Sequence, residues 1–353
     1  MDATISKRIV FLGFVMTCFI VLYHAGQIDS SQAVNAIDSK LNDAIGFIMD
    51  KLAVLAMSWF FSVTGFLLFR DLTYGNYSQK MKRRFFSLFV PYILWETITM
   101  IKLAIQASPT LDTVVQWLSR IFLFSGFPPD GALWYMYAVF VIGLLSPAIL
   151  FVVSRKHGLT LTVLLIIALV AIRHNIGGFF TNVLSYGYLS NVISYMPCYI
   201  CGSYVGYLSN DARQLSNCLR LVVAIVATVI ALEWFWAGVT FDTSLRLLPV
   251  GLLYSFPVRN ALLSKWLFKH SFLIYAIHQP LIFDIRPIVR KAINGIIPYV
   301  SLTNVCSRIV LLIIIVAAAV LLYAILNKVW PKALSLLTGN RTAVHSDAGA
   351  SVA

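Results

Sequence analysis

The sequence predicts an all-α, polytopic membrane protein with about ten transmembrane helices and with both termini in the cytoplasm. Of its 353 residues, 59% are hydrophobic and only 12% are charged, whereas soluble domains carry about 25% charged residues. Apolar stretches near the ~20 residues that a transmembrane helix needs recur along the chain. Lys and Arg gather in alternate connections between these stretches, as the positive-inside bias predicts.

Ten apolar stretches are candidate spans, and they leave little chain for a soluble domain. They cover residues 8–27, 46–69, 85–106, 132–153, 159–176, 192–209, 219–239, 243–258, 267–286 and 305–327. We expect one transmembrane domain over 1–330 and a short disordered cytoplasmic tail over 331–353, because that tail is polar and rich in small residues. No secretory cleavage site follows the first span, so we expect it to be retained.

Two connections stand out from the short ones. The first outer loop, QIDSSQAVNAIDSKLND, is polar and mildly acidic. The connection 107–131 contains the apolar stretch WLSRIFLFSGFPPDG, which is too short to form another span. We expect this stretch to be re-entrant or to lie on the membrane surface.

The net charge of +13 does not indicate nucleic-acid binding, because the basic residues are scattered over short connections. With a cytoplasmic N-terminus and ten alternating spans, 17 of the 27 Lys and Arg residues lie in cytoplasmic segments. The last outer connection, with Arg286, Arg290 and Lys291, goes against this bias. The expected partner of this charge is therefore membrane lipid.

The five cysteines are scattered through the spans and do not form a disulfide framework. Cys198 and Cys201 form a CxxC pattern, but they lie in a stretch of small residues that indicates packing thiols. We expect no metal site.

Polar side chains lie at both ends of the predicted spans. His24 closes the apolar run FVMTCFIVLYH near the outer surface, where an imidazole can act as a general base at neutral pH. An interfacial histidine with an ordinary hydrogen bond is the simpler alternative. On the cytoplasmic side, Lys82, Arg83 and Arg84 follow Lys80 at the foot of the third span. Such a cluster can hold phosphates, or it can serve only to anchor the chain at anionic lipid.

Glu96, Glu233 and His278 lie mid-span, where an ionisable side chain needs a partner or a water-filled cavity. Glu96 is a better catalytic candidate than Glu233, because it shares a helix with the basic cluster, although it could be only an orienting or paired group. His278 precedes Pro280, whose ring disturbs the helix and frees backbone carbonyls. The histidine could simply satisfy one of these carbonyls.

Trp134 and Tyr135 open the fourth span at the outer surface. They fit an interfacial aromatic belt, and the same amphipathic surfaces can stack on a sugar. In the second span, Ser62, Thr64 and Gly65 form a small polar patch, which favours close packing of helices.

Taken together and in this order, the segments resemble acyltransferase family 3, the bacterial inner-membrane O-acyltransferases. The blocks that carry the resemblance are CFIVLYH, FFSVTGFLLF, KRRFFSLFVPYILW, ALWYMYAVFVIGLLSP and, more loosely, SFLIYAIHQPLI. Two positions depart from the family pattern: Gly13 and Ser87 stand where many members carry arginine.

The resemblance implies a protein of the bacterial inner membrane that moves an acyl group, usually acetyl, from cytoplasmic acyl-CoA to a hydroxyl of an extracytoplasmic glycan such as O-antigen or exopolysaccharide. Acetyl-CoA is then the expected cosubstrate. The resemblance implies a histidine base at His24, CoA binding by Lys82, Arg83 and Arg84, and glycan binding by Trp134 and Tyr135. From their own positions within the spans, we expect Glu96 to be catalytic and His278 to bind the substrate. The alternative from another class is a transporter or flippase of a lipid-linked sugar or small solute. The lack of internal repeats argues against that alternative.

Overall fold

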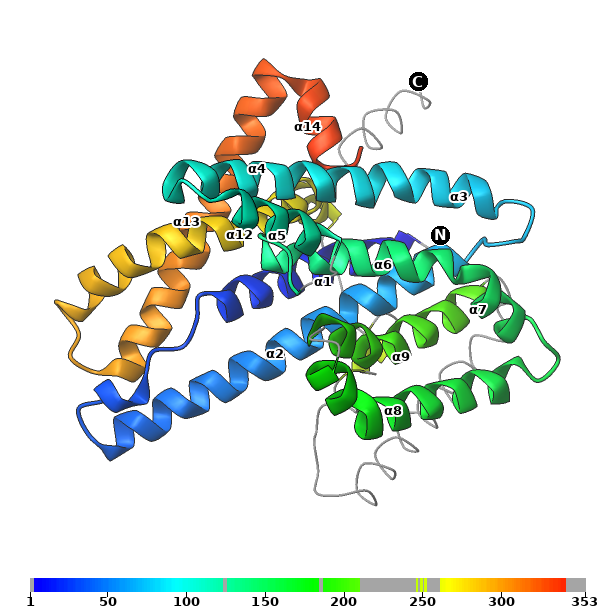
Figure 1. Cartoon of the computed structure of the whole chain (residues 1–353), viewed down its shortest axis with the longest axis horizontal. Coiled ribbons are helices and arrows are strands. Elements are labelled where there is room, and N and C mark those ends of the chain that lie inside the picture. The colour runs from blue at the N-terminus through cyan, green and yellow to red at the C-terminus, as the bar shows by residue number, and fades with distance from the viewer. Residues whose placement is uncertain are drawn as a thin grey trace. The chain divides into compact units, whose positions relative to one another are not determined.

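The structure is a computed structural model, and it describes residues 3–122, 126–183, 187–209, 246, 248, 249, 251, 252 and 261–340. Every regular element in these ranges is a helix, which confirms the all-α prediction (Figure 1). The chain divides into two compact units, and each is described separately. Unit 1 contains Met1–Met57 and Pro257–Thr338, and unit 2 contains Ser58–Phe256 and Gly339–Ala353.

Five helices of the described chain are long and apolar enough to cross a membrane, and a bent helix pair raises this number to six. The single segments are Ile5–His24, Ala36–Phe69, Tyr77–Ala107, His270–Asn294 and Val300–Val329. The bent pair joins Gly131–Leu144 to Ser146–Val153 at an angle of 60°. These lengths and compositions are those of a multi-pass membrane protein. The predicted span 219–239 lies outside the described residues with Glu233, and most of 243–258 does so too.

Unit 1 is built on a helical hairpin. It contains α1 (Ala3–His24), the first part of α2 (Ala36–Phe69), α12 (Ala261–Asn294), α13 (Val300–Val329) and α14 (Pro331–Leu337). Helices α12 and α13, yellow and orange in Figure 1, run side by side, and α1 packs against both. Ala25, Val289 and Leu311 are buried together where the end of α1 meets this hairpin.

The first outer loop is shorter than predicted, because α2 begins at Ala36. Asn35 caps this helix: its Oδ1 atom accepts hydrogen bonds from the backbone N–H groups of Ile37 and Asp38. Only residues 25–35 remain outside helices α1 and α2, and they include the short 3₁₀ turn η1 (Ser30–Gln32). Capping by Asn35 therefore extends helix into a sequence whose polarity indicated a loop.

Unit 2 contains the rest of α2, several helices that lead to a bent pair, and a second hairpin. The elements are α3 (Tyr77–Arg84), the π-helical turn η2 (Phe85–Phe89), α4 (Val90–Ala107), α5 (Leu111–Ile121), the 3₁₀ turn η3 (Gly131–Leu133), α6 (Trp134–Leu144), α7 (Ser146–Val153), α8 (Gly158–Val183) and α9 (Gly187–Leu208). Helix α8 packs on α9, and α6 packs on η2.

Helices α2 and α9 approach so closely that side chains are excluded between them. A Cβ atom at Gly202 would collide with the backbone carbonyl of Ser62, and one at Gly206 would collide with that of Phe66. A Cβ at Gly65 would collide with the Tyr199 carbonyl. The predicted packing role of the small-residue patch in the second span is confirmed.

The connection 107–131 and the predicted tail 331–353 both contain a helix. Between 107 and 131, helix α5 exposes the apolar side chains of Leu111, Val115 and Leu118 along one face, a pattern typical of a helix that lies on a membrane surface. The predicted disordered tail begins with helix α14, which buries Leu334. Apolar burial orders this part of the tail, and residues from 341 onward lie outside the described residues.

Candidate functional site

The predicted site residues fall into two sets, one in each unit. In unit 1, His24 is the last residue of α1 and His278 lies within α12. Their imidazole rings lie 5.1 Å apart, centroid to centroid. His24 is half-buried, whereas the His278 side chain is completely buried. The fold thus brings together two residues that are 254 positions apart in the sequence.

The hydrogen bond of His278 fixes its tautomer. The Nδ1 atom lies 2.5 Å from the Tyr275 carbonyl oxygen, and a carbonyl only accepts, so the proton is on Nδ1. In the neutral ring the Nε2 atom then carries a lone pair, and it is buried without a hydrogen-bond partner among the described residues. His278 does satisfy a backbone carbonyl, as the simpler interpretation predicted, but it also keeps an acceptor for a donor group.

Two arginines hold the end of α1, next to His24. Arg308 on α13 is 3% exposed, and its Nη1 donates to the Leu22 carbonyl. Arg290 on α12 donates through Nη2 to the carbonyls of Ala25 and Gly26, at 2.9 and 2.6 Å. The last carbonyls of a helix have no intrahelical partner, so cations at this end stabilise it.

An amide network completes this arrangement. Gln27 accepts through Oε1 from the Arg308 Nη2 and from the Asn304 Nδ2, at 3.0 and 2.8 Å. Asn304 in turn accepts from the Arg308 Nε and donates to Asn42 Oδ1. The network ties α1, α2 and α13 together around the backbone that carries His24.

Hydrogen bonds from the N-terminus of α13 to Asp38 on α2 also join these two helices near the amide network. Asp38, which is 3% exposed, accepts hydrogen bonds from the backbone N–H groups of Val300 and Ser301 and from the Ser301 hydroxyl. Its carboxylate lies at the N-terminus of α13, where the helix dipole favours negative charge. Asp38, Asn304 and Arg308 were not among the residues predicted from the sequence. The available signal was polar residues in and beside the strongly apolar stretch around 305–327.

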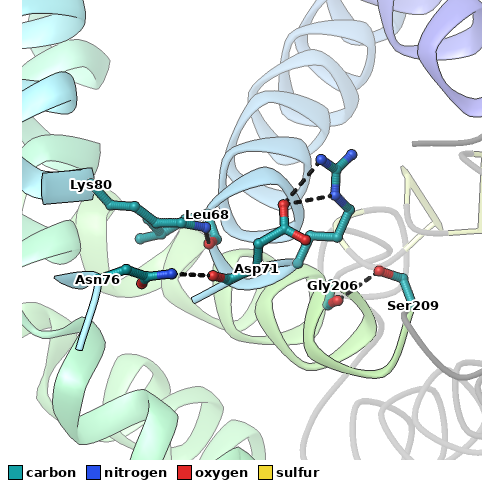
Figure 2. A network of polar contacts seen from close by, with 7 residues as sticks. Leu68, Asp71, Asn76, Lys80, Gly206 and Ser209 are labelled. Atoms are coloured by element: carbon teal, nitrogen blue, oxygen red, sulfur yellow. Dashed lines mark hydrogen bonds and ion pairs between the residues drawn. The ribbon is translucent and has the colours of Figure 1, made fainter. Parts of the chain in front are cut away.

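In unit 2, the residues of the basic cluster have different surroundings. Lys80 donates through Nζ to the Leu68 carbonyl at 2.9 Å, which caps the end of α2. Figure 2 shows this contact beside the bond from Asn76 to the Asp71 carbonyl, which closes the turn between α2 and α3. Lys82 and Arg83 are exposed. Lys80 is therefore structural, whereas Lys82 and Arg83 can face an external anion.

Arg84 turns towards the protein interior. Its Nη2 donates to the Thr64 carbonyl at 2.9 Å, and its Nη1 is buried without a hydrogen-bond partner in the described chain. The Thr64 hydroxyl lies 2.5 Å from the Tyr135 hydroxyl, which donates to the Phe60 carbonyl. Arg84 and Tyr135, predicted in different roles, therefore meet at the same residue of α2.

Glu96 lies next to Asp130, a residue that was not predicted as part of a site. The Asp130 backbone N–H donates to Glu96 Oε2 at 3.0 Å, and both side chains are at most 1% exposed. Asp130 Oδ1 accepts from the Ala132 N–H, whereas Glu96 Oε1 and Asp130 Oδ2 have no partner in the described chain. Burial raises the pKa of Asp130 to about 8. A proton on one carboxyl would supply the missing donor, and two adjacent buried carboxyls disfavour double ionisation.

Trp134 and Tyr135 lie in an aromatic cluster rather than at an open surface. They are 8% and 9% exposed. Both contact the Phe61 ring, at 5.9 and 5.0 Å between centroids, and Trp134 also contacts Tyr195. In this arrangement their rings pack against protein, so stacking on a sugar would require this cluster to open.

The described residues contain no group of three or more His, Cys, Asp or Glu side chains that could hold a metal ion. Cys198 and Cys201 are buried thiols outside any disulfide, and Cys198 donates to the Arg246 carbonyl at 3.2 Å. These contacts fit the predicted packing role of the CxxC pattern.

Comparison with known proteins identifies the family. The family described as an acyltransferase domain matches residues 12–324, which is most of the chain. The succinoglycan biosynthesis protein ExoH of Rhizobium meliloti (strain 1021) is similar, with 23% identity over 368 residues that cover 97% of this chain and 94% of that protein. No solved structure matches. The chain therefore belongs to acyltransferase family 3 and is a multi-pass member of this membrane transferase family.

Proposed function

We propose that this protein is an O-acyltransferase of the bacterial inner membrane that moves an acyl group, acetyl in the first instance, from cytoplasmic acyl-CoA to a hydroxyl of an extracytoplasmic glycan. Membership of acyltransferase family 3 supports the reaction class. The name of the similar protein, which refers to succinoglycan biosynthesis, supports a glycan such as an exopolysaccharide or O-antigen as the acceptor.

The pair formed by His24 and His278 is the observation that carries this proposal. A sugar hydroxyl is a weak nucleophile until it loses its proton, and a positioned histidine base contributes about 10²–10⁴-fold. His24 is the half-buried and hence accessible member, so we assign it the role of base. The free Nε2 atom of His278 then accepts a hydrogen bond from the acceptor glycan or from the His24 ring.

The reaction joins the hydroxyl oxygen to the carbonyl carbon of the thioester and breaks the carbon–sulfur bond. The hydroxyl proton passes to the base, and the CoA thiolate leaves and is protonated. Lys82 and Arg83, which are exposed, provide cations for the CoA phosphates. Glu96, buried beside Asp130, is assigned a proton-holding role in unit 2.

The proposed topology has ten spans over 1–330 with N- and C-termini in the cytoplasm, followed by the tail 331–353. The pairing of α2 with α9 supports it. Ser62 faces Gly202 and Phe66 faces Gly206, so these two helices run in the same direction. In an alternating arrangement they are the second and sixth spans, and even-numbered spans do run in the same direction.

The test is glycan composition in a bacterial host with a defined surface polysaccharide. Base-labile acyl groups on that polysaccharide, present with the wild-type chain and absent with an empty vector, are the expected result. Purified protein should also bind acetyl-CoA, measured by calorimetry. Protein that binds no acyl-CoA and instead moves a lipid-linked sugar across vesicles would overturn the proposal in favour of transport.

A further inference from the structure

Three polar groups in unit 2 are buried without hydrogen-bond partners in the described chain: Arg84 Nη1, the Ser146 hydroxyl and the Tyr199 hydroxyl. The side chains of Ser146 and Tyr199 are completely buried. Arg84, Ser146 and Tyr199 belong to three different helices, α3, α7 and α9. None of the assigned roles uses Ser146 or Tyr199.

The three groups lie close together. The Arg84 charge and the Ser146 hydroxyl both act on the Tyr199 phenol, although the contact between the two hydroxyls lacks the geometry of a full hydrogen bond. The hydrogen bond from Arg84 to the Thr64 carbonyl fixes the guanidinium against α2. A Cβ atom at Gly143 would lie 3.9 Å from the Arg84 Cδ, so α6 leaves room for the arginine stem.

A proline lies near each of the three positions. The π-helical turn η2 follows Arg84 directly and precedes Pro91, and the 60° bend between α6 and α7 lies at Ser146, before Pro147. Tyr199 follows Pro197 within α9. Proline removes a helical hydrogen bond, and π-helical turns occur frequently at functional sites. A π-helical turn, a helix bend or a proline within a helix therefore lies next to each donor.

Energetics argue against a purely structural role. A buried donor that lacks a partner costs about 1–3 kcal/mol, and an arginine in a membrane domain is expected to pair with an anion or to face a polar cavity. Arg84 forms no ion pair with a carboxylate in the described chain. The Arg84 Nη1 and the two hydroxyls, each without a hydrogen-bond partner in the described chain, are donors that match an oxygen atom that acquires negative charge.

We propose that Arg84, Ser146 and Tyr199 form the oxyanion site that receives the carbonyl oxygen of the acyl-CoA thioester; this inference rests on the proposed transferase function. When the nucleophile adds to the carbonyl carbon, the carbonyl π electrons move to the oxygen, which accepts hydrogen bonds from the three donors. When the carbon–sulfur bond breaks, that electron pair re-forms the carbonyl and the thiolate leaves. Such donors act mainly on the transition state.

The test compares Tyr199→Phe and Ser146→Ala with the wild type in membrane vesicles that acylate the host polysaccharide. We expect kcat to fall about 10²-fold or more for Tyr199→Phe, while the affinity for CoA, which has the phosphates but no carbonyl, stays unchanged. Thermal stability should stay equal or rise, because each variant removes an unpaired buried hydroxyl. Ser203→Ala is the matched control, since its hydroxyl already donates to the Tyr199 carbonyl at 2.8 Å.

If the two variants lost affinity for CoA and for acetyl-CoA equally, the inference would be overturned, since the two hydroxyls would then bind the CoA phosphates. Unchanged kcat in both variants would overturn it too. Should Tyr199→Phe fail to fold, Ser146→Ala carries the same test on another helix. A failure of the proposed function is distinguishable, because the wild-type protein itself would then neither bind CoA nor acylate glycan.

Discussion

His24 and His278 place their imidazole rings 5.1 Å apart although they belong to the first and the next-to-last long helices of the chain. The Tyr275 carbonyl sets the His278 tautomer and leaves Nε2 as an acceptor. His278 is fully buried and has its tautomer set by this hydrogen bond, whereas His24 is half-buried. In the proposed reaction, His24 moves the proton while His278 holds a fixed orientation.

Replacement of His278 by asparagine tests the free nitrogen atom. In His278→Asn, the introduced amide retains an N–H near the Nδ1 position that can bind the Tyr275 carbonyl, but it lacks the Nε2 acceptor. We expect acyl transfer to fall about 10²-fold or more, with little change in expression. His157→Asn, at an exposed histidine, is the control. Near-normal transfer by His278→Asn would limit His278 to satisfying the carbonyl.

Arg308 is predicted to position His24 through the backbone. Arg308→Lys keeps the charge but cannot reproduce the bonds to the Leu22 carbonyl, Gln27 and Asn304. We expect a loss of about 1.5–3 kcal/mol in unfolding free energy. We also expect a lower kcat and a shifted pH–rate profile, with the KM for acyl-CoA unchanged. Arg155→Lys, at an exposed arginine, serves as the control. A stability loss with an unchanged pH profile would leave Arg308 with a structural role only.

Replacement of glycine by alanine should have opposite effects on stability at Gly202, in the close contact of α2 and α9, and at Gly13 on α1. Gly202→Ala would place a methyl group against the Ser62 backbone, so we expect destabilisation by about 1–3 kcal/mol. At Gly13, a Cβ atom meets nothing within 4 Å. Gly13→Ala should therefore stabilise helix α1 by about 0.5–1 kcal/mol. Thermal unfolding in detergent measures both, and an equally stable Gly202→Ala variant would contradict the observed helix contact.

Asp130 predicts a specific pH dependence. Burial raises its pKa to about 8, while the N–H of Ala132 and the charge of Lys102 oppose the rise. An unfolded aspartate titrates near a pKa of about 3.9, so between about pH 4 and 8 the folded state binds more protons. The free energy of unfolding therefore falls as the pH rises through this window.

Asp130→Asn removes this proton and keeps a side chain of similar shape. Its melting temperature should depend less on pH between pH 6 and 9 than that of the wild type, and it should be the more stable protein at pH 9. Asp112→Asn, at an exposed position on α5, is the control. A wild-type slope in Asp130→Asn would exclude Asp130 as the titrating group.

The sequence was sufficient for the all-α membrane fold class and for the choice of candidate site residues, because hydropathy and polar residues in apolar runs are local properties. His24, Arg84 and Glu96 were identifiable in this way. Their partners were not: Asp130 lies in a loop, and no sequence pattern singled out Arg308. The pairing of His24 with His278 depends on contacts across 254 positions, which periodicity and composition do not encode.

Some differences between the expected and the observed structure also have local physical causes. Capping by Asn35 converts part of a polar loop into helix α2. Trp134 and Tyr135 have the composition of an interfacial belt, but Phe61 and Tyr195 cover their rings. Polarity and amphipathicity describe what a residue can face, whereas packing decides what it does face.

The most direct test of the central claim is the amount of base-labile acyl group on the surface polysaccharide of a bacterial host that expresses either the wild-type chain or His24→Ala at equal levels. We expect acyl groups with the wild-type chain and a loss of at least about 10²-fold with the variant. Equal acylation by both proteins would contradict the assignment of His24 as the base. No acylation by the wild-type chain, together with no binding of acetyl-CoA, would contradict the proposed transferase function itself.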